Sequence, residues 1–207
     1  MTKFGAIVLC GGGSSRMGQP KAWLPFGNEF LLQRIVRIVS DVCSPVLVVS
    51  ALDQVLPPLP RDIRIVHDER PGCGPLAGLE CGLKELTTEV VFLTSCDLPL
   101  LTAHFVRTVC ESLTVPYEIA VPVNAGRKHP LSAAYRSRLL PAVTSALDAG
   151  ERRMLAFLEH HRTMNILEID EDCLRNTNTP AEYAEVLVIA ESRGLISASR
   201  FPSVSVA

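Results

Sequence analysis

The chain has 207 residues, of which 20 are lysine or arginine and 22 are aspartate or glutamate, so its formal net charge is −2 at neutral pH. With 47% hydrophobic and 20% charged residues, the composition excludes a disordered or collagen-like protein, and the length suits one domain with a substantial core. The nearly neutral balance argues against general binding to nucleic acid or to a membrane surface.

The first half of the chain alternates short apolar runs with helical patterns. Apolar runs bounded by turn residues are typical of buried strands, and apolar residues that recur every three or four positions are typical of amphipathic helices. Thr102 suits the start of one helix because its side-chain oxygen can accept a backbone N–H. Strands are predicted at residues 4–9, 46–50, 63–66 and 90–95, and helices at residues 30–42, 77–86 and 102–113.

The second half is less regular. Two apolar segments flank residues 124–130, which indicates a hairpin or an excursion from the sheet. The last helix is predicted from Pro180 to about residue 189, with Thr179 as its N-terminal cap. The other predicted elements are strands at residues 119–123, 131–135 and 164–169 and helices at residues 137–148 and 152–160.

This order of elements predicts an α/β fold in which helices cover both faces of a parallel sheet. The residues from 192 onward are small, polar and without period. We therefore expect a single domain over residues 1–191 and a poorly ordered tail over residues 192–207.

The cysteines predict a reducing compartment. Their number, seven, is odd, and no Cys-x-x-Cys pair occurs. The apolar run at residues 4–10 is too short for a secretory leader, and no apolar stretch approaches the roughly 18 residues of a membrane span. We therefore expect free thiols in a cytoplasmic protein, and no Cys/His spacing that is typical of a metal site.

Basic residues are concentrated in two segments without acids. Residues 1–28 contain Lys3, Arg16 and Lys21 and no acid, and residues 119–147 contain four basic residues and no acid. If the two segments converge in the fold, they can bind an anionic ligand. A chance distribution of surface charge is the alternative.

Residues 9–21 follow the first predicted strand and read LCGGGSSRMGQPK. Glycines let backbone N–H groups face a bound anion without a Cβ in the way, and two cations add charge. The segment lacks the Lys-Ser/Thr pair of a Walker A loop, because Gln19 and Pro20 stand there, and Arg16 stands where a dinucleotide fingerprint needs its third glycine. It is therefore interpreted as another type of phosphate cradle, with a plain turn as the alternative.

This segment resembles the L-x-G-G-x-S-x-R-M-G-x-x-K signature of a nucleotidyltransferase family, with Cys10 where alanine is usual. Five later segments narrow the resemblance to molybdenum cofactor guanylyltransferases, because they are similar to blocks of those enzymes in the same order. The resemblance covers about residues 5–187. The five segments are GPLAGL at residues 74–79, CDLP at 96–99, HPL at 129–131, GERR at 150–153 and NTNTP at 176–180.

The resemblance implies a three-layer, Rossmann-like nucleotidyltransferase fold with a mostly parallel central sheet. The implied reaction joins GTP to molybdopterin that already carries molybdenum, and it forms the guanine dinucleotide cofactor and pyrophosphate. The acceptor phosphate is already anionic, so the protein needs no nucleophile of its own and acts by positioning and electrostatics. Molybdenum-insertion proteins and molybdoenzyme chaperones are the implied partner proteins.

The resemblance also implies roles for particular residues. Arg16 and Lys21 would contact the triphosphate and, with Asp97, form the catalytic set. Asp97 would hold Mg²⁺, which often uses one or two carboxylates together with substrate phosphates. Ser50 stands where the family often has asparagine. The implied nucleotide contacts are Leu9, Cys10, Gly11, Gly12, Gly13, Lys21, Ser50, Asp68, Gly74, Gly78 and Asp97, and the implied pterin contacts are His129, Arg153, Asn176 and Asn178.

Structural alternatives stay open for several of these residues. Asp97 could cap a helix, and Asn176 and Asn178 could cap the helix that begins at Pro180. His129 and the arginines could be ordinary surface residues. For the whole chain, the alternatives are a nucleotidyltransferase that uses CTP or ATP or acts on a sugar phosphate, and a nucleotide-binding protein without enzymatic activity.

Overall fold

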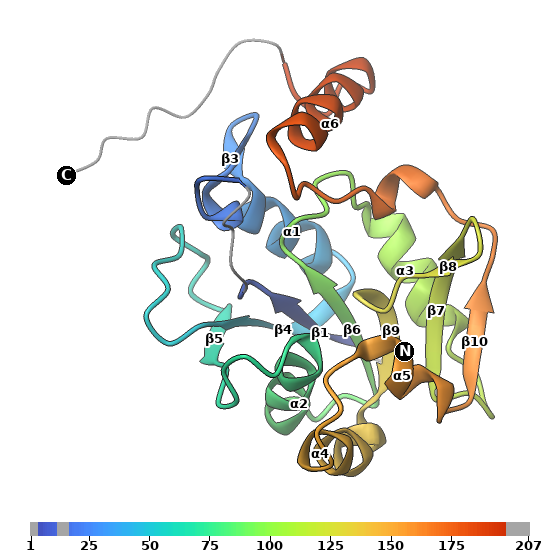
Figure 1. The fold of residues 1–207 in the computed structure, drawn as a ribbon. Helices are drawn as coiled ribbons and strands as arrows, with labels where there is room; N and C mark the ends of the chain where they lie inside the picture. The colour runs from blue at the N-terminus through green and yellow to red at the C-terminus, as the bar shows by residue number, and fades with distance from the viewer. Residues whose placement is uncertain (1–3, 12–16, 198–207) are drawn as a thin grey trace.

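The computed structural model describes residues 4–11 and 17–197, which form one sheet with helices on both faces (Figure 1). Within these residues, eight strands make up the sheet. The path across it is β10 (Thr163–Ile166), β7 (Ile119–Asn124), β9 (Ser132–Arg136), β6 (Val90–Ser95), β1 (Phe4–Leu9), β4 (Cys43–Ser50) and β5 (Arg64–His67), and β8 (Arg127–Lys128) pairs with β7.

The sheet is mostly parallel, as predicted. Strands β6, β1, β4 and β5 pair in parallel, and so do β7 and β10. Strand β9 runs antiparallel to both of its neighbours, β6 and β7. The pairing of Thr94 with Ser132 therefore places the start of β9 at the edge where β6 ends. Residues from both halves of the chain meet at this edge.

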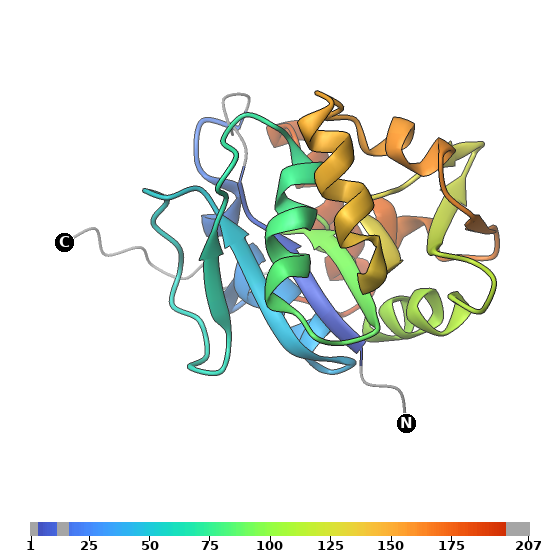
Figure 2. The same ribbon diagram turned by 90° about the horizontal axis from the view of Figure 1, so that it is seen from below.

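Two layers of helices cover the sheet because side chains alternate between its faces. Ala6 and Val8 pack with α1 (Leu31–Ser40) and α3 (Ala103–Ser112). Ile7 and Leu9 pack with α2 (Pro75–Glu85), α4 (Leu140–Asp148) and α5 (Met154–Glu159). Figure 2 shows α2 and α4 side by side on their face of the sheet.

A third apolar cluster joins the two ends of the described chain. Helix α6 (Pro180–Ser192) packs through Val186 and Ala190 against Phe26 and Leu31, next to the small hairpin of β2 (Pro25–Phe26) and β3 (Glu29–Phe30). This hairpin and the 3₁₀ turn η1 (Lys21–Trp23) were not predicted, because elements of two or three residues carry no periodicity.

The capping predictions for α3 and α6 are confirmed. The Thr102 hydroxyl accepts the Phe105 N–H at 3.2 Å, and the Thr179 hydroxyl accepts the Glu182 N–H at 3.2 Å. The predicted helix at 137–148 is divided into a 3₁₀ turn (Ser137–Leu139) and α4. The division follows from Pro141, which lacks an N–H and is tolerated only in the first turn of a helix.

The last described residues continue beyond the predicted domain boundary. Helix α6 ends at Ser192, where the tail was predicted to begin. Ile196 packs against the third apolar cluster, and residues 198–207 lie outside the described part. All seven cysteines are free thiols. Among the described helices, none is long and apolar enough to cross a membrane.

Candidate active site

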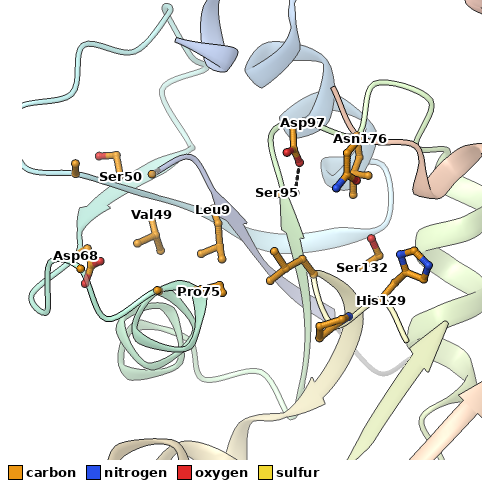
Figure 3. Close-up of a pocket in the computed structure, with 18 of the residues that line it drawn as sticks. Leu9, Val49, Ser50, Asp68, Pro75, Ser95, Asp97, His129, Ser132 and Asn176 are labelled. Atoms are coloured by element: carbon orange, nitrogen blue, oxygen red, sulfur yellow. Dashed lines mark hydrogen bonds between the residues drawn. The ribbon is translucent and has the colours of Figure 1, made fainter. Parts of the chain in front are cut away.

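A cleft of about 900 Å³ opens at the edge of the sheet where the parallel strands end (Figure 3). Leu9 ends β1, Ser50 ends β4, and Asp68 and Asp97 follow β5 and β6. Ligands of parallel α/β sheets gather at this edge because the connecting loops converge there. The cleft therefore lies where the fold places a binding site.

The order of the strands gives the cleft two ends. Ser50, Asp68 and Glu69 line one of them, called here the β5 end. Arg127, Lys128, His129 and Ser132 line the other, called the β8 end. Figure 3 shows Asp97 between the Ser50 side and the His129 side, with Asn176 close to it. A ligand that fills the cleft must pass Asp97.

Asp97 is held by contacts to both its side chain and its backbone. The Ser95 hydroxyl donates to Oδ1, and the Lys21 ammonium donates to Oδ2 at 2.7 Å. The Asp97 carbonyl accepts the N–H of Thr177 at 3.0 Å and its hydroxyl at 3.4 Å. The side chains of Asp97 and Lys21 are only 13% and 20% exposed. Of this partly buried ion pair, Asp97 lines the cleft, and Lys21 reaches it through the Asp97 carboxylate.

Lys21 links this carboxylate to the segment before α6. Its ammonium also donates to the side-chain oxygen of Asn178 at 2.5 Å. Lys21 begins the turn η1, so three segments that are distant in sequence meet at one ammonium group. A carboxylate and an ammonium together can bind a metal–phosphate group, with the carboxylate facing the metal and the ammonium facing phosphate oxygens.

The Asn176–Asn178 segment is positioned by the start of α6. Glu182 accepts the N–H of Asn178 at 2.7 Å and that of Thr179 at 3.0 Å, which completes a capping box with the Thr179 hydroxyl. Thr179 caps α6 and Thr102 caps α3, so neither asparagine nor Asp97 has a capping role. Asn176 lines the cleft instead, and Asn178 binds Lys21.

The β5 end is held together by backbone contacts. The Asp68 N–H donates to the Ser50 carbonyl at 2.9 Å, and the Asp68 carboxylate accepts the N–H of Arg70 at 2.8 Å. The buried Ser50 hydroxyl lies 3.2 Å from Nδ1 of His67. The hydroxyl of Ser50 is therefore already engaged inside the protein.

The loop between β5 and α2 is anchored by an ion-pair network. Arg70 binds the buried Glu80 of α2 at 3.0 Å and Asp148 of α4 at 2.7 Å. The Thr144 hydroxyl donates to Glu80 at 2.8 Å. Lys84 lies 3.5 Å from the same carboxylate. A buried carboxylate with three partners is costly to disturb, so this network keeps Asp68 in place relative to α2.

Helix α2 directs its N-terminus to the cleft. Gly74 precedes it with a φ of +74°, which favours glycine, and no acid occupies the first turn. Free N–H groups and the helix dipole favour an anion there. Gly78 lines the cleft, but its main requirement is packing, because a Cβ would lie 2.6 Å from the Leu9 side chain.

The β8 end carries positive charge. Arg127 and Lys128 form β8, and His129 follows them. Burial, and then the charge of Arg127, lower the pKa of His129 below its usual value. The histidine is therefore neutral at neutral pH, and the positive charge of this end comes from the arginine and the lysine.

The structure brings most of the predicted site residues together. Cys10 is buried below the cleft floor, where its carbonyl accepts Gln54 Nε2 at 2.7 Å. The Arg153 side chain is 80% exposed, is held by Glu151, and does not line the cleft. Gly12, Gly13 and Arg16 lie outside the described residues. The predicted residues that line the cleft are Leu9, Gly11, Ser50, Asp68, Gly74, Gly78, Asp97, His129 and Asn176.

Sequence reasoning did not select four residues that the cleft uses. Ser95 and Thr177 hold Asp97, and no sequence pattern connects them with it. Arg127 and Lys128 line the β8 end. Their signal was present, because both lie in the second acid-free segment, but only the fold shows which of its charges face the cleft.

Three comparisons place these observations among known proteins. The model of the MobA-like NTP transferase domain matches residues 6–164. A probable molybdenum cofactor guanylyltransferase of Carboxydothermus hydrogenoformans is 34% identical, over 91% of this chain and 98% of that protein. The crystal structure of molybdopterin-guanine dinucleotide biosynthesis protein A from Archaeoglobus fulgidus has a TM-score of 0.73 and 18% identity, over 91% of this chain and 99% of that one.

A cytidylyltransferase has a similar fold. The 2-C-methyl-D-erythritol 4-phosphate cytidylyltransferase of Thermus thermophilus gives a TM-score of 0.68 at 17% identity, over 92% of this chain and 98% of that one. At this identity the likeness concerns the fold alone. The Rossmann-like arrangement that was predicted for the chain is therefore that of nucleotidyltransferases.

Proposed function

The chain belongs to the family of MobA-like NTP transferase domains, and from this premise we propose that it transfers GMP from GTP to molybdenum-bound molybdopterin and releases pyrophosphate. The observation that carries the proposal is the ion pair of Asp97, which lines the middle of a two-ended cleft, with Lys21, whose ammonium also binds Asn178. It occurs in a chain that aligns over nearly its whole length with relatives named molybdenum cofactor guanylyltransferases.

The nucleotide occupies the β5 end. Its base and ribose lie against Ser50 and Asp68, on the floor to which Leu9 contributes, with Cys10 buried after it. The triphosphate runs from there past Gly11 toward Asp97. The strand-end geometry of these residues supports this placement, as does the N-terminus of α2 between Gly74 and Gly78, which favours an anion. Gly12, Gly13 and Arg16 complete the phosphate loop in the proposal.

Asp97 has the chemistry expected of a Mg²⁺ ligand. Its carboxylate faces the cleft and already holds a cation, the Lys21 ammonium, at 2.7 Å. Among the described residues, no group of three or more histidines, cysteines or carboxylates can hold a metal by itself. This donor set fits a metal that takes one carboxylate and completes its shell with phosphate oxygens and water. When bound, Mg²⁺ would neutralise charge on the triphosphate.

The protein acts on the reaction by position and charge. An oxygen of the acceptor phosphate forms a bond to the α-phosphorus of GTP, and the bond from that phosphorus to the bridging oxygen breaks. The electron pair leaves with pyrophosphate, so no protein nucleophile is required. Lys21 donates hydrogen bonds to the triphosphate when it leaves Asp97, and Ser95 and Thr177 keep Asp97 in place. Positioning and electrostatic stabilisation are the main contributions.

The pterin lies on the other side of Asp97. Asn176 and His129 line that side, and the Asn178 amide becomes available when Lys21 turns toward phosphate. An asparagine amide can pair a donor and an acceptor with a pterin edge. Arg153 would have to release Glu151 in order to take part. The proposal includes a cytoplasmic location and, as partners, molybdenum-insertion proteins and molybdoenzyme chaperones.

A nucleotide panel tests this function. The protein is incubated with molybdenum-bound molybdopterin, Mg²⁺ and one of GTP, CTP, ATP or UTP, and pyrophosphate is measured. Release with GTP, at a rate at least about tenfold above that with the other nucleotides, is expected. Release with CTP alone would assign the chain to cytidylyl transfer. No release with any of the four nucleotides would overturn the proposal, provided that a second guanylyltransferase is active in the same assay.

A further inference from the structure

We infer that Arg127 and Lys128, on the hairpin of β7 and β8, bind the terminal phosphate of the acceptor. The ligand class is a phosphomonoester dianion attached to the pterin. The inference rests on the proposed function and adds two specificity-determining residues to it.

The first step is the position of the hairpin relative to Asp97. Along the sheet edge, the ends of β5, β4 and β1 lie on one side of Asp97, and the start of β9 and the hairpin lie on the other. In-line transfer requires the attacking and leaving oxygens on opposite sides of the phosphorus. With the nucleoside and the leaving pyrophosphate both on the β1–β5 side of Asp97 and the reacting phosphorus beside it, the acceptor phosphate approaches from the β8 end.

The second step is the charge at that end. In the part of the chain that the structure describes, no ion pair or side-chain hydrogen bond engages Arg127 or Lys128. Two arginines of the same acid-free segment behave differently, since Arg136 is bound by Glu89 and Arg138 by Glu118. Arg127 and Lys128 are thus the charges of this segment that are available to a ligand in the cleft.

The β5 end is less suited than the β8 end to the acceptor phosphate. Asp68 and Glu69 line the β5 end and repel an additional dianion. An arginine binds phosphate through two parallel N–H groups, and a lysine adds a point charge. The distribution of charge therefore assigns the acceptor phosphate to the hairpin.

The third step is the shape of the hairpin. Its two turn residues, Ala125 and Gly126, have φ values of +48° and +75°. Alanine is strained in this region, and such strain persists where the surrounding structure requires it. The turn pairs Asn124 with Arg127 and Val123 with Lys128, so the two cations are held on a strand and not on a loose loop.

The base of the hairpin is held as well. The His129 N–H donates to the Pro122 carbonyl at 2.9 Å, and the hydroxyl of the buried Tyr135 donates to the Pro130 carbonyl at 2.8 Å. The backbone that carries the two cations therefore has a fixed place beside the cleft before the acceptor arrives, which reduces the backbone entropy that is lost on binding.

The test compares Arg127→Ala, Lys128→Ala and the double variant with the matched control Arg138→Ala. Arg138 carries the same charge in the same segment but is paired with Glu118 and does not line the cleft. Steady-state kinetics are measured on the full chain with each substrate varied in turn. Each single variant is expected to raise the KM for molybdopterin by about tenfold, as for loss of one charge-assisted hydrogen bond. In these variants the KM for GTP is expected to stay within about twofold of the wild-type value. In Arg138→Ala both KM values are expected to stay within about twofold.

Direct binding separates this inference from the proposed function. The affinity for molybdopterin and for its dephosphorylated form is measured without nucleotide, so that turnover is not needed. Weaker binding of the phosphorylated form alone in the double variant supports the inference even if GTP is not used. The inference would be overturned if the double variant bound molybdopterin and its dephosphorylated form as tightly as wild type, or lost affinity for both equally. A rise in the KM for GTP instead of the KM for molybdopterin would also overturn it.

Discussion

The ammonium of Lys21 lies 2.7 Å from Oδ2 of Asp97, and the two residues are 76 positions apart in the sequence. The same ammonium lies 2.5 Å from Oδ1 of Asn178. One cation thus joins the carboxylate that we assign to the metal and nucleotide with an amide that we assign to the acceptor. Arrival of the triphosphate requires Lys21 to exchange partners, which links the two halves of the cleft.

Replacing Asp97 tests the metal role. Asp97→Ala removes the carboxylate that fits a metal and should lower kcat by at least about 10²–10³-fold, while the protein stays folded. Steady-state kinetics at several Mg²⁺ concentrations and thermal melting measure the two effects. Asp53→Ala, on an exposed position that does not line the cleft, is the control. A wild-type rate in Asp97→Ala would remove the metal role.

Replacing Lys21 tests the triphosphate role. Lys21→Ala should raise the KM for GTP by about tenfold or more, since one charge-assisted contact is lost. Lys21→Arg should not restore it, because a planar guanidinium does not fit the point between the Asp97 carboxylate and the Asn178 amide. Initial rates at varied GTP measure the effect. Unchanged kinetics in both variants would contradict the assignment.

The capping box of α6 should influence the acceptor more than the nucleotide. Glu182→Ala removes the acceptor of the Asn178 and Thr179 N–H groups and should cost about 0.5–2 kcal/mol of unfolding free energy. It should also raise the KM for molybdopterin, with the KM for GTP unchanged. Urea denaturation and kinetics check both effects. Glu185→Ala, exposed on the same helix, is the matched control and should alter neither.

Arg34 is expected to hold the turn that carries Asp97. It is 5% exposed, donates to the Pro99 carbonyl at 2.6 Å, and stacks over Phe26. Burial lowers the pKa of this guanidinium, although Glu29 opposes the shift. Arg34→Met leaves the buried Pro99 carbonyl without this donor and should lower the unfolding free energy by about 1–3 kcal/mol.

Arg37→Met provides the comparison for Arg34. Arg37 binds the same Glu29, but its side chain is 54% exposed. Arg37→Met should lower the unfolding free energy by less than about 1 kcal/mol. Urea denaturation of both variants measures the two losses. Equal losses in the two variants would show that the Pro99 contact is not what Arg34 contributes.

His129 should make folding stability depend on pH. Burial lowers its pKa in the folded protein, so the unfolded chain binds a proton more readily. The stability that the neutral histidine contributes is present above the unfolded pKa of about 6.5 and is lost as the pH falls through this value toward the folded pKa. From about pH 7.5 to about pH 5.5, wild type should therefore lose more unfolding free energy than His129→Asn. Equal losses in urea denaturation would contradict the assignment.

Local signals in the sequence were sufficient for most elements. Strand β6 has the predicted bounds, because a continuous apolar run between turns leaves little choice. The starts of α3 and α6 follow from Thr102 and Thr179, whose hydroxyls satisfy N–H groups within three residues. The resemblance in ordered blocks indicated the family, and most of its residues that the structure describes line the cleft or contact Asp97.

The tertiary structure decided what depends on contacts between distant segments. The reversed direction of β9 places Ser132 and the hairpin with Arg127 at the same edge as Asp97, and no periodicity within β9 indicates its direction. The fold also separated two residues that were both predicted to contact the pterin. Arg153 is held by Glu151 outside the cleft, whereas Asn178 contacts Lys21, which is 157 positions away in the sequence. Local propensity acts over a few residues, whereas these pairings form only when the sheet and its loops are assembled.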